Sequence, residues 1–134
     1  MTTEKDDITI VHLREGASKL QHRDWGKGWK NIHVDNWHMR HFVVLVQRNE
    51  AVGIASYVDE SFAAPGYLGV AAVEIRPDYR NRKLSKQLVQ ALVSVAATQQ
   101  KGLRVGYFEP MGVERLRHQF LEMGQAANIP LQLA

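Results

Sequence analysis

Apolar and polar residues alternate along the first half of the chain with the two-residue period of strands. This alternation predicts a first strand over residues 8–14. It predicts two more strands over residues 40–48 and 51–59, and Asn49-Glu50 between them reads as a tight turn, so these two strands form a hairpin. A short, weak helix signal over residues 14–25 lies between the first strand and the hairpin.

The next part of the chain switches to the helical period after one more strand. Residues 67–76 form an almost continuous apolar run that indicates a strand buried on both faces, and Pro77 ends it. A stripe of apolar residues at three- and four-residue spacing then predicts a helix over residues 82–99, with Gly102 marking its end. The stripe consists of Leu84, Leu88, Val89, Leu92, Val95 and Ala96.

Strand and helix patterns alternate again up to the carboxyl end. Residues 103–108 predict a fourth strand, Pro110 suits the first turn of a last helix that Gly124 stops, and residues 129–134 predict a short strand. The residues that line this last helix are Val113, Leu116 and Phe120. The strand, helix and strand at 67–108 form a βαβ unit, whose strands are parallel and joined by a right-handed crossover. The sequence therefore predicts an α/β (α+β) protein with a mixed central sheet flanked by helices.

Length and composition restrict the class of protein. With 134 residues, of which 45% are hydrophobic and 23% charged, we expect a single domain over 1–134, with residues 1–7 flexible. The absence of cysteine excludes disulfides, thiolate catalysis and thiolate metal sites. The longest apolar runs fall far short of the ~20 residues that span a bilayer. The polar start "MTTEKDD" does not read as a signal peptide, so we expect a cytoplasmic protein without a membrane partner.

The formal net charge of +3 is spread unevenly along the chain. Residues 76–86 contain one acid, Asp78, and the bases Arg76, Arg80, Arg82, Lys83 and Lys86. These bases lie where a buried strand turns into a helix, and the free N–H groups and dipole of a helix amino end attract an anion such as a pyrophosphate. Because the patch is local and not a broad basic stripe, a protein that tracks nucleic acid is disfavoured.

The segment "VEIRPDYRNRKLSKQLVQAL" (73–92) resembles the acyl-coenzyme A binding segment of the GNAT acetyltransferase superfamily. Ile75, Pro77, Tyr79 and Arg80 stand at the positions of the family's Val-x-Pro-x-Tyr-Arg motif, and the order of elements is also similar. The resemblance implies an N-acetyltransferase that uses acetyl-CoA as cosubstrate and an amine as acceptor, with the pantetheine between strands 70–75 and 103–108. It implies cofactor contacts at Val73, Ile75, Arg80, Asn81, Arg82, Lys83, Leu84, Ser85 and Lys86.

The chain departs from the family pattern in two places. Lys83 and Ser85 stand where the family has glycine and then glycine or alanine. A lysine there must keep ordinary dihedrals or accept a cost of about 1–2 kcal/mol. Its ammonium could pair with a phosphate, or the loop no longer binds the cofactor. Phe120 stands four residues before Gly124, where family members often carry the tyrosine that protonates the leaving thiolate.

Two residues remain as candidates for proton transfer in the implied reaction. Glu74, the only acid of the strand at 67–76, could deprotonate the amine directly or through water, or it could pair with a neighbouring arginine. Tyr107, in the strand after the helix, is the remaining hydroxyl near the expected cofactor, although an aromatic residue in a strand more often packs in a core.

Tryptophans Trp25, Trp29 and Trp37 alternate with basic residues, as in proteins that stack the bases of single-stranded nucleic acid. In GNAT-like folds this early segment shapes the acceptor side. The resemblance therefore implies substrate contacts at Trp29, Trp37 and His38. Core or interface packing of at least two of the tryptophans is the simplest interpretation.

Histidines near the predicted hairpin raise the question of a metal site. His33, His38 and His41 would not fall on one face of a strand, and no carboxylate-histidine pattern at helical spacing accompanies them. We therefore expect no metal site.

Two hypotheses for the function stay open at this point. The first is an acetyl-CoA-dependent N-acetyltransferase whose acceptor is a protein lysine, an amino terminus, a polyamine, an aminoglycoside or a nucleotide amine. The second is a catalytically inactive GNAT-like protein that binds a protein or nucleic-acid partner, which the altered glycines and Phe120 favour. The short chain also resembles small phage-encoded members of the superfamily, and a free edge at its carboxyl end favours a homodimer formed by strand addition.

Overall fold

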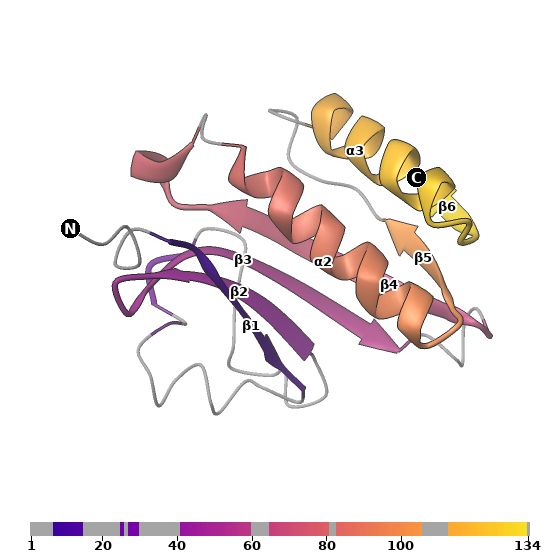
Figure 1. Ribbon diagram of the computed structural model, residues 1–134, viewed down its shortest axis with the longest axis horizontal. Coiled ribbons are helices and arrows are strands. Elements are labelled where there is room, and N and C mark those ends of the chain that lie inside the picture. Colours follow the sequence, from indigo (N-terminus) through magenta and orange to yellow (C-terminus); the bar gives the residue numbers. More distant parts are fainter. Residues whose placement is uncertain are drawn as a thin grey trace.

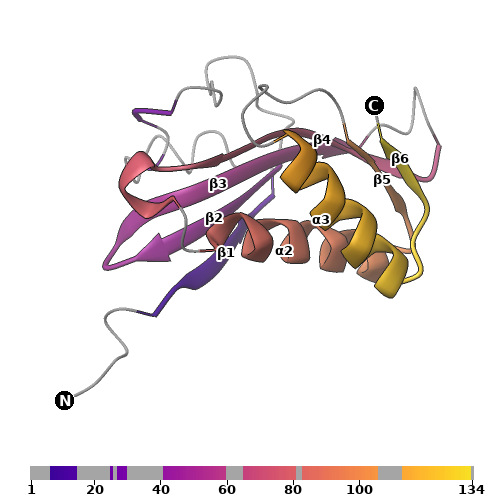
Figure 2. The same cartoon turned by 90° about the horizontal axis from the view of Figure 1, so that it is seen from above.

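The protein is described as a computed structural model over residues 7–14, 25, 27–29, 41–59, 65–80, 83–105 and 113–133. The described residues form a six-stranded sheet in the order β1 to β6, with helices α2 and α3 on one face (Figures 1 and 2). The elements are β1 (Thr9–Leu13), β2 (His41–Gln47), β3 (Glu50–Asp59), β4 (Tyr67–Ile75), the 3-10 helix η2 (Pro77–Tyr79), α2 (Leu84–Thr98), β5 (Gly102–Val105), α3 (Val113–Ala126) and β6 (Leu131–Leu133).

The sheet has an antiparallel half and a parallel half. Strands β1 to β4 pair antiparallel with their neighbours, whereas β4 with β5 and β5 with β6 are parallel. This arrangement confirms the predicted mixed sheet and the βαβ unit built on α2. Most of the weak helix at 14–25, residues 106–108 of the fourth predicted strand, Pro110 and residues 1–6 lie outside the described residues.

The hairpin turn lies one residue earlier than the sequence predicts. Arg48 and Asn49 have φ values of 52° and 65°, and Glu50 already pairs with Gln47. Two consecutive positive φ values are typical of the two-residue turns whose twist matches that of the flanking strands. The predicted turn at Asn49-Glu50 is therefore wrong by one position, because the strand pairing needs Glu50 in the ladder.

Helix α2 buries the predicted apolar stripe except Val95, which is partly buried, and it ends differently from the prediction. Its buried residues are Leu84, Leu88, Val89, Ala91, Leu92, Val93 and Ala96. The helix ends at Thr98, and Gln100 adopts the left-handed conformation with φ 57°. Gly102 does not end the helix; it is the first residue of β5, where it pairs with Tyr67.

Gly102 stands where two other parts of the chain approach closely. A Cβ at this position would lie 2.6 Å from the carbonyl oxygen of Pro130 and 2.7 Å from the ring of Tyr67. We expect Gly102→Ala to lower the free energy of unfolding by about 1–3 kcal/mol, because backbone atoms have to shift. Urea denaturation measures this loss. Gly66→Ala is the control, since its Cβ would meet no atom within 4 Å and only the positive φ of 85° opposes it. Equal stability of Gly102→Ala and the wild type would contradict the steric account.

Gly124 does not stop the last helix, contrary to the prediction. Helix α3 continues to Ala126, and Gly124 is buried within it. A Cβ at Gly124 would lie 2.6 Å from the side chain of Leu131 in β6. The glycine therefore lets β6 pack closely against α3.

Two hydrophobic clusters lie on opposite faces of the sheet. The larger cluster joins α2 to residues of β2, β3, β4 and β5, and it also contains the fully buried Phe120 of α3. The smaller cluster, on the other face, is formed by Leu13, Trp25, Trp29, Phe42, Val44, Val46, Ala51, Ile54 and Ala72. Among the described residues, no helix has the length and apolar character that crossing a membrane would need.

Candidate functional site

Among the described residues, strand β4 is paired with β5 over only about half of its length, and the rest of that side is called its free edge below. β5 pairs with β4 only over Tyr67–Val70, and no other described strand pairs with Ala71–Ile75 on that side. Backbone N–H and C=O groups at such an edge need hydrogen-bond partners. Val73 and Ile75, two of the predicted cofactor contacts, lie on this free edge.

A bulge changes the direction in which the β4 side chains point. Tyr57 of β3 pairs with Val70, and the preceding Ser56 pairs with Ala72, so Ala71 has no direct partner. Val70 packs with α2, whereas Ala72 packs in the cluster on the opposite face. Such bulges are common next to active sites, where they re-aim side chains.

Glu74 lies on the face of the sheet opposite α2. It pairs with Ile54, a member of the smaller cluster, and only 8% of its surface is exposed. Residues directly opposite one another on neighbouring strands point to the same face. Glu74 is thus an acid on a largely apolar face, next to the free edge of β4. The other candidate for proton transfer, Tyr107, lies outside the described residues.

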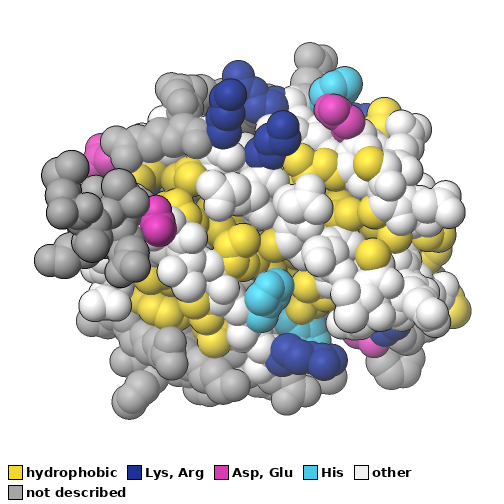
Figure 3. All heavy atoms as spheres, viewed as in Figure 1, with side chains coloured by type: hydrophobic (Ala, Val, Ile, Leu, Met, Phe, Trp, Pro, Cys, Tyr) yellow, Lys and Arg dark blue, Asp and Glu magenta, His cyan; other side chains and the backbone are white. Residues whose placement is uncertain are grey.

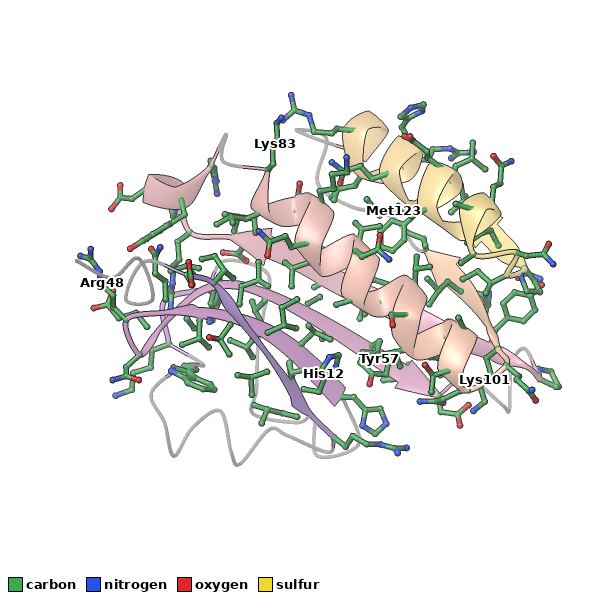
Figure 4. The ribbon with its side chains drawn as sticks, viewed as in Figure 1. His12, Arg48, Tyr57, Lys83, Lys101 and Met123 are labelled. Carbon is green, nitrogen blue, oxygen red and sulfur yellow. The ribbon has the colours of Figure 1, made fainter. Side chains whose placement is uncertain are left out.

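Lys83 adopts a left-handed backbone conformation, which glycine adopts without steric cost. It has φ 61° and ψ 22° directly before the first residue of α2, and its side chain is exposed (Figure 4). Of the two alternatives left by the sequence, the chain has thus taken the strained one, at a cost of about 1–2 kcal/mol. The first turn of α2 carries no acid, and basic side chains gather at this end of the helix (Figure 3).

The other predicted cofactor residues divide into solvent-facing and protein-bound groups. Lys86 is exposed, whereas Leu84 is buried and can offer only its backbone. Arg80 is exposed and donates from Nε to the carbonyl oxygen of Ile75 at 3.3 Å. Ser85 donates to Oε1 of Gln119 in α3 at 3.5 Å. Asn81 and Arg82 lie outside the described residues.

Arg76 belongs to the basic patch in the sequence but points into the protein. Its Nε donates to the carbonyl oxygen of Ala51 at 3.2 Å, and its Nη2 donates to that of Lys27 at 2.7 Å. Its guanidinium carbon lies 3.8 Å from the ring centroid of Trp29. The placement of Arg76 among the anion-attracting bases is therefore wrong. Charge along a sequence does not distinguish a phosphate ligand from a residue that ties two segments together.

The tryptophans at 25 and 29 pack against the protein. Trp25 and Trp29 are 9% and 8% exposed. The indole N–H of Trp25 donates to the carbonyl oxygen of Asn49 at 3.2 Å, and that of Trp29 donates to the carbonyl oxygen of Trp25. This confirms the packing interpretation for two tryptophans, and contact of Trp29 with an acceptor stays a prediction. Trp37 and His38 lie outside the described residues.

His41 and Tyr57 lie opposite each other on β2 and β3. His41 and Tyr57 have ring centroids 5.1 Å apart. Burial raises the pKa of the Tyr57 hydroxyl, and the charge of Arg14 partly opposes this. In the part of the chain that the structure describes, no three residues of His, Cys, Asp or Glu gather as metal ligands. His33 and His38 fall outside that part.

The family to which the chain belongs follows from a comparison with protein-family models. Residues 11–112 match the model of the acetyltransferase (GNAT) family, and this match covers more than half of the chain. The chain therefore belongs to the acetyltransferase (GNAT) family. The resemblance seen in the sequence is confirmed, and with it the class of acetyl-CoA-dependent acetyltransferase.

Solved structures share the fold at low sequence identity. An aminoglycoside acetyltransferase from an uncultured soil metagenomic sample, solved with sisomicin, has a TM-score of 0.61 at 11% identity, covering 92% of this chain and 90% of that one. Aminoglycoside N-acetyltransferase AAC(6′)-Iy, solved with CoA, has a TM-score of 0.60 at 16% identity, covering 92% and 88%. A Trypanosoma brucei acetyltransferase has a TM-score of 0.59 at 15% identity, covering 84% and 90%. No curated protein sequence matches this chain.

Proposed function

We propose that this chain transfers the acetyl group of acetyl-CoA to a primary amine. The observation that carries the proposal is the free edge of β4 at Ala71–Ile75, followed by Lys83 in a left-handed backbone conformation at a glycine position of the family motif. Backbone strain of about 1–2 kcal/mol, such as Lys83 bears, is found preferentially at ligand-binding sites.

The chain supplies charge and a strand edge for the cosubstrate. Lys83 and Lys86 are exposed beside the amino end of α2, where their ammonium groups and the helix N–H groups attract a pyrophosphate. The backbone of Val73 and the N–H group of Ile75 offer hydrogen bonds to the amide groups of an extended pantetheine. The same edge would also orient the thioester and polarise its carbonyl.

Glu74 provides the base for the amine. The amine nitrogen attacks the thioester carbonyl, the carbon–sulfur bond breaks, and the proton lost by the nitrogen passes to Glu74 directly or through water. Coenzyme A can leave as the thiolate, because an ordinary thiol has a pKa of about 8.5 and needs no strong acid. The absence of a hydroxyl at Phe120 is therefore compatible with turnover.

Binding and transfer are measured separately to test the proposal. Calorimetry should detect acetyl-CoA binding, and release of the free thiol should follow when a primary amine is added. No heat of binding at millimolar acetyl-CoA would overturn the proposal. Binding without transfer to any amine would favour the alternative, a catalytically inactive GNAT-like protein that acts on a protein or nucleic-acid partner.

Replacing the proposed base should reduce turnover and leave the cosubstrate bound. We expect Glu74→Gln to lower kcat by about 10²-fold or more, since general base catalysis contributes about 10²–10⁴-fold. The dissociation constant of acetyl-CoA should stay within about threefold of the wild type, because the amide keeps the size of the side chain. Glu122→Gln on the exposed surface of α3 is the matched control. An unchanged kcat in Glu74→Gln would remove Glu74 from the mechanism.

The acceptor is proposed to be a small molecule with a primary amine. Two of the structural relatives are aminoglycoside acetyltransferases, which makes amino sugars the first class to test. Location in the cytoplasm stays a prediction. A homodimer also stays a prediction, with β1 and β6 as the edge strands of the described sheet.

A further inference from the structure

Ser56 is a buried hydroxyl without a hydrogen-bond partner among the described residues. None of the Ser56 surface is exposed to solvent (0%). Among the described residues, its Oγ is the one buried side-chain oxygen or nitrogen without a hydrogen-bond partner. A buried hydroxyl in this state costs about 1–3 kcal/mol. Alanine at the same position in β3 would avoid that cost. The fold therefore leaves the Ser56 hydroxyl without a hydrogen bond.

The position of Ser56 connects it to the reaction site. Ser56 pairs with Phe42 on one side and Ala72 on the other, and both belong to the cluster on the face opposite α2. Its β4 partner directly follows the bulged residue Ala71. Ser56 thus lies beside the point at which the edge of β4 becomes free.

On its β4 side Ser56 faces small residues, whereas Phe42 lies opposite it on β2. Ala72 lies directly opposite Ser56, the exposed Ala71 precedes it, and Gly69 pairs with Val58, the next residue but one along β3. The strip formed by Gly69 and Ala72 on this face fills less space than larger residues would. An unpartnered hydroxyl beside such a strip favours a bound group over additional protein packing.

Glu74 is the diagonal neighbour of Ser56 on the same face. Ser56 is opposite Ala72, and Glu74 comes two residues later in β4. Diagonal neighbours of this kind lie about 7–8 Å apart, with their Cβ atoms somewhat closer. A carboxylate and a hydroxyl at this separation can contact two polar groups of a single small molecule.

We propose that Ser56 is a specificity-determining residue of the acceptor site. Its hydroxyl binds a second polar group of the acceptor, such as a hydroxyl or another amine, while the reacting amine lies at Glu74. The preferred acceptor is thus a multifunctional amine, in which the reacting nitrogen and the second group belong to one sugar-sized or amino-acid-sized unit. This inference rests on the proposed acetyl transfer.

The test compares Ser56→Ala with the wild type on two kinds of amine. Kanamycin, spermidine and an Nα-blocked lysine amide carry a second polar group, whereas n-butylamine carries none. We expect Ser56→Ala to lower kcat/KM about tenfold or more for the multifunctional amine that the wild type prefers, as for a lost hydrogen bond to substrate. The value for n-butylamine and the KM of acetyl-CoA should stay unchanged.

Thermal stability separates this role from a structural one. Ser56→Ala removes an unpaired hydroxyl, so its melting temperature should equal or exceed that of the wild type while its discrimination between amines falls. Ser94→Ala, on the exposed side of α2, is the matched control and should behave as the wild type. The conservative variant Ser56→Thr keeps a hydroxyl and should therefore retain the discrimination between amines that Ser56→Ala loses.

Each outcome bears on one of the two proposals. Equal kinetics of Ser56→Ala and the wild type on every amine would overturn the inference and leave the acetyl transfer standing. An equal loss on n-butylamine, or no preference of the wild type for a multifunctional amine, would also overturn it. Failure of the wild type to acetylate any of these amines would contradict the proposed function, and the inference with it.

Discussion

Lys83→Gly is expected to raise the free energy of unfolding by about 1 kcal/mol and, in the same protein, to weaken acetyl-CoA binding about tenfold. Stability should rise because glycine adopts the φ of 61° without the steric cost that lysine bears. Affinity should fall because the ammonium that pairs with a phosphate oxygen is lost. Urea denaturation and calorimetry measure the two effects. Opposite changes in stability and affinity are what a strained binding residue produces.

Two further variants control this experiment. Lys83→Glu places a repelling charge at the same point and should weaken acetyl-CoA binding more than Lys83→Gly does. Lys101→Ala removes a lysine at the other end of α2, where the side chain pairs with Asp59 at 2.9 Å, and should leave the affinity unchanged (Figure 4). Acetyl-CoA binding by Lys83→Gly that equals or exceeds that of the wild type would show that the ammonium is no phosphate ligand.

Phe120→Ala is expected to lower the free energy of unfolding by about 3–5 kcal/mol, the largest stability effect among the variants considered. Phe120 is fully buried in the cluster that joins α3 to α2 and the sheet. Removing its ring leaves a cavity that the neighbouring side chains fill only in part. Urea denaturation monitored by tryptophan fluorescence measures the loss.

Phe120→Tyr tests whether this position could hold the family's acid. The sequence places Phe120 where a tyrosine often protonates the leaving thiolate, but the count from Gly124 assumed that the helix stops there, and α3 continues to Ala126. We expect Phe120→Tyr to cost about 1–3 kcal/mol for an unpaired buried hydroxyl and to leave kcat unchanged. Phe120→Leu, a tolerated change of shape, controls for packing. A clear rise of kcat in Phe120→Tyr would show that the position faces the reacting sulfur.

The structure favours a loop that still binds the cosubstrate, at the point where the sequence leaves two alternatives open. Lys83 and Ser85 replace the family's small residues, which suggested a loop that had lost its ligand. The backbone at Lys83 nevertheless adopts a left-handed conformation that glycine favours. Ser85 directs its hydroxyl to Gln119 of α3, so the second substitution joins two helices and does not fill the space before α2.

The strands, the helices and the family motif could be predicted from the sequence because each depends on neighbours in the chain. The stripe at Leu84, Leu88 and Leu92 marks helix α2 through its spacing alone. Glu74 was found as the only acid of a buried strand, and Lys83 through its place in the motif. Boundaries at Asn49, Gly102 and Gly124 were misplaced, since pairing and packing with other elements determine where these segments end.

The sequence by itself determined the class of fold, the family and the basic start of α2, all of which follow from local patterns of a few residues. Only the tertiary structure decided which polar groups are engaged by the protein and which remain to be engaged by a ligand. It turned Arg76 onto Trp29, buried Phe120 and left the hydroxyl of Ser56 unpaired beside Ala72. The physical reason is that hydrogen bonding and burial depend on residues that are distant in the chain and adjacent only in the folded sheet.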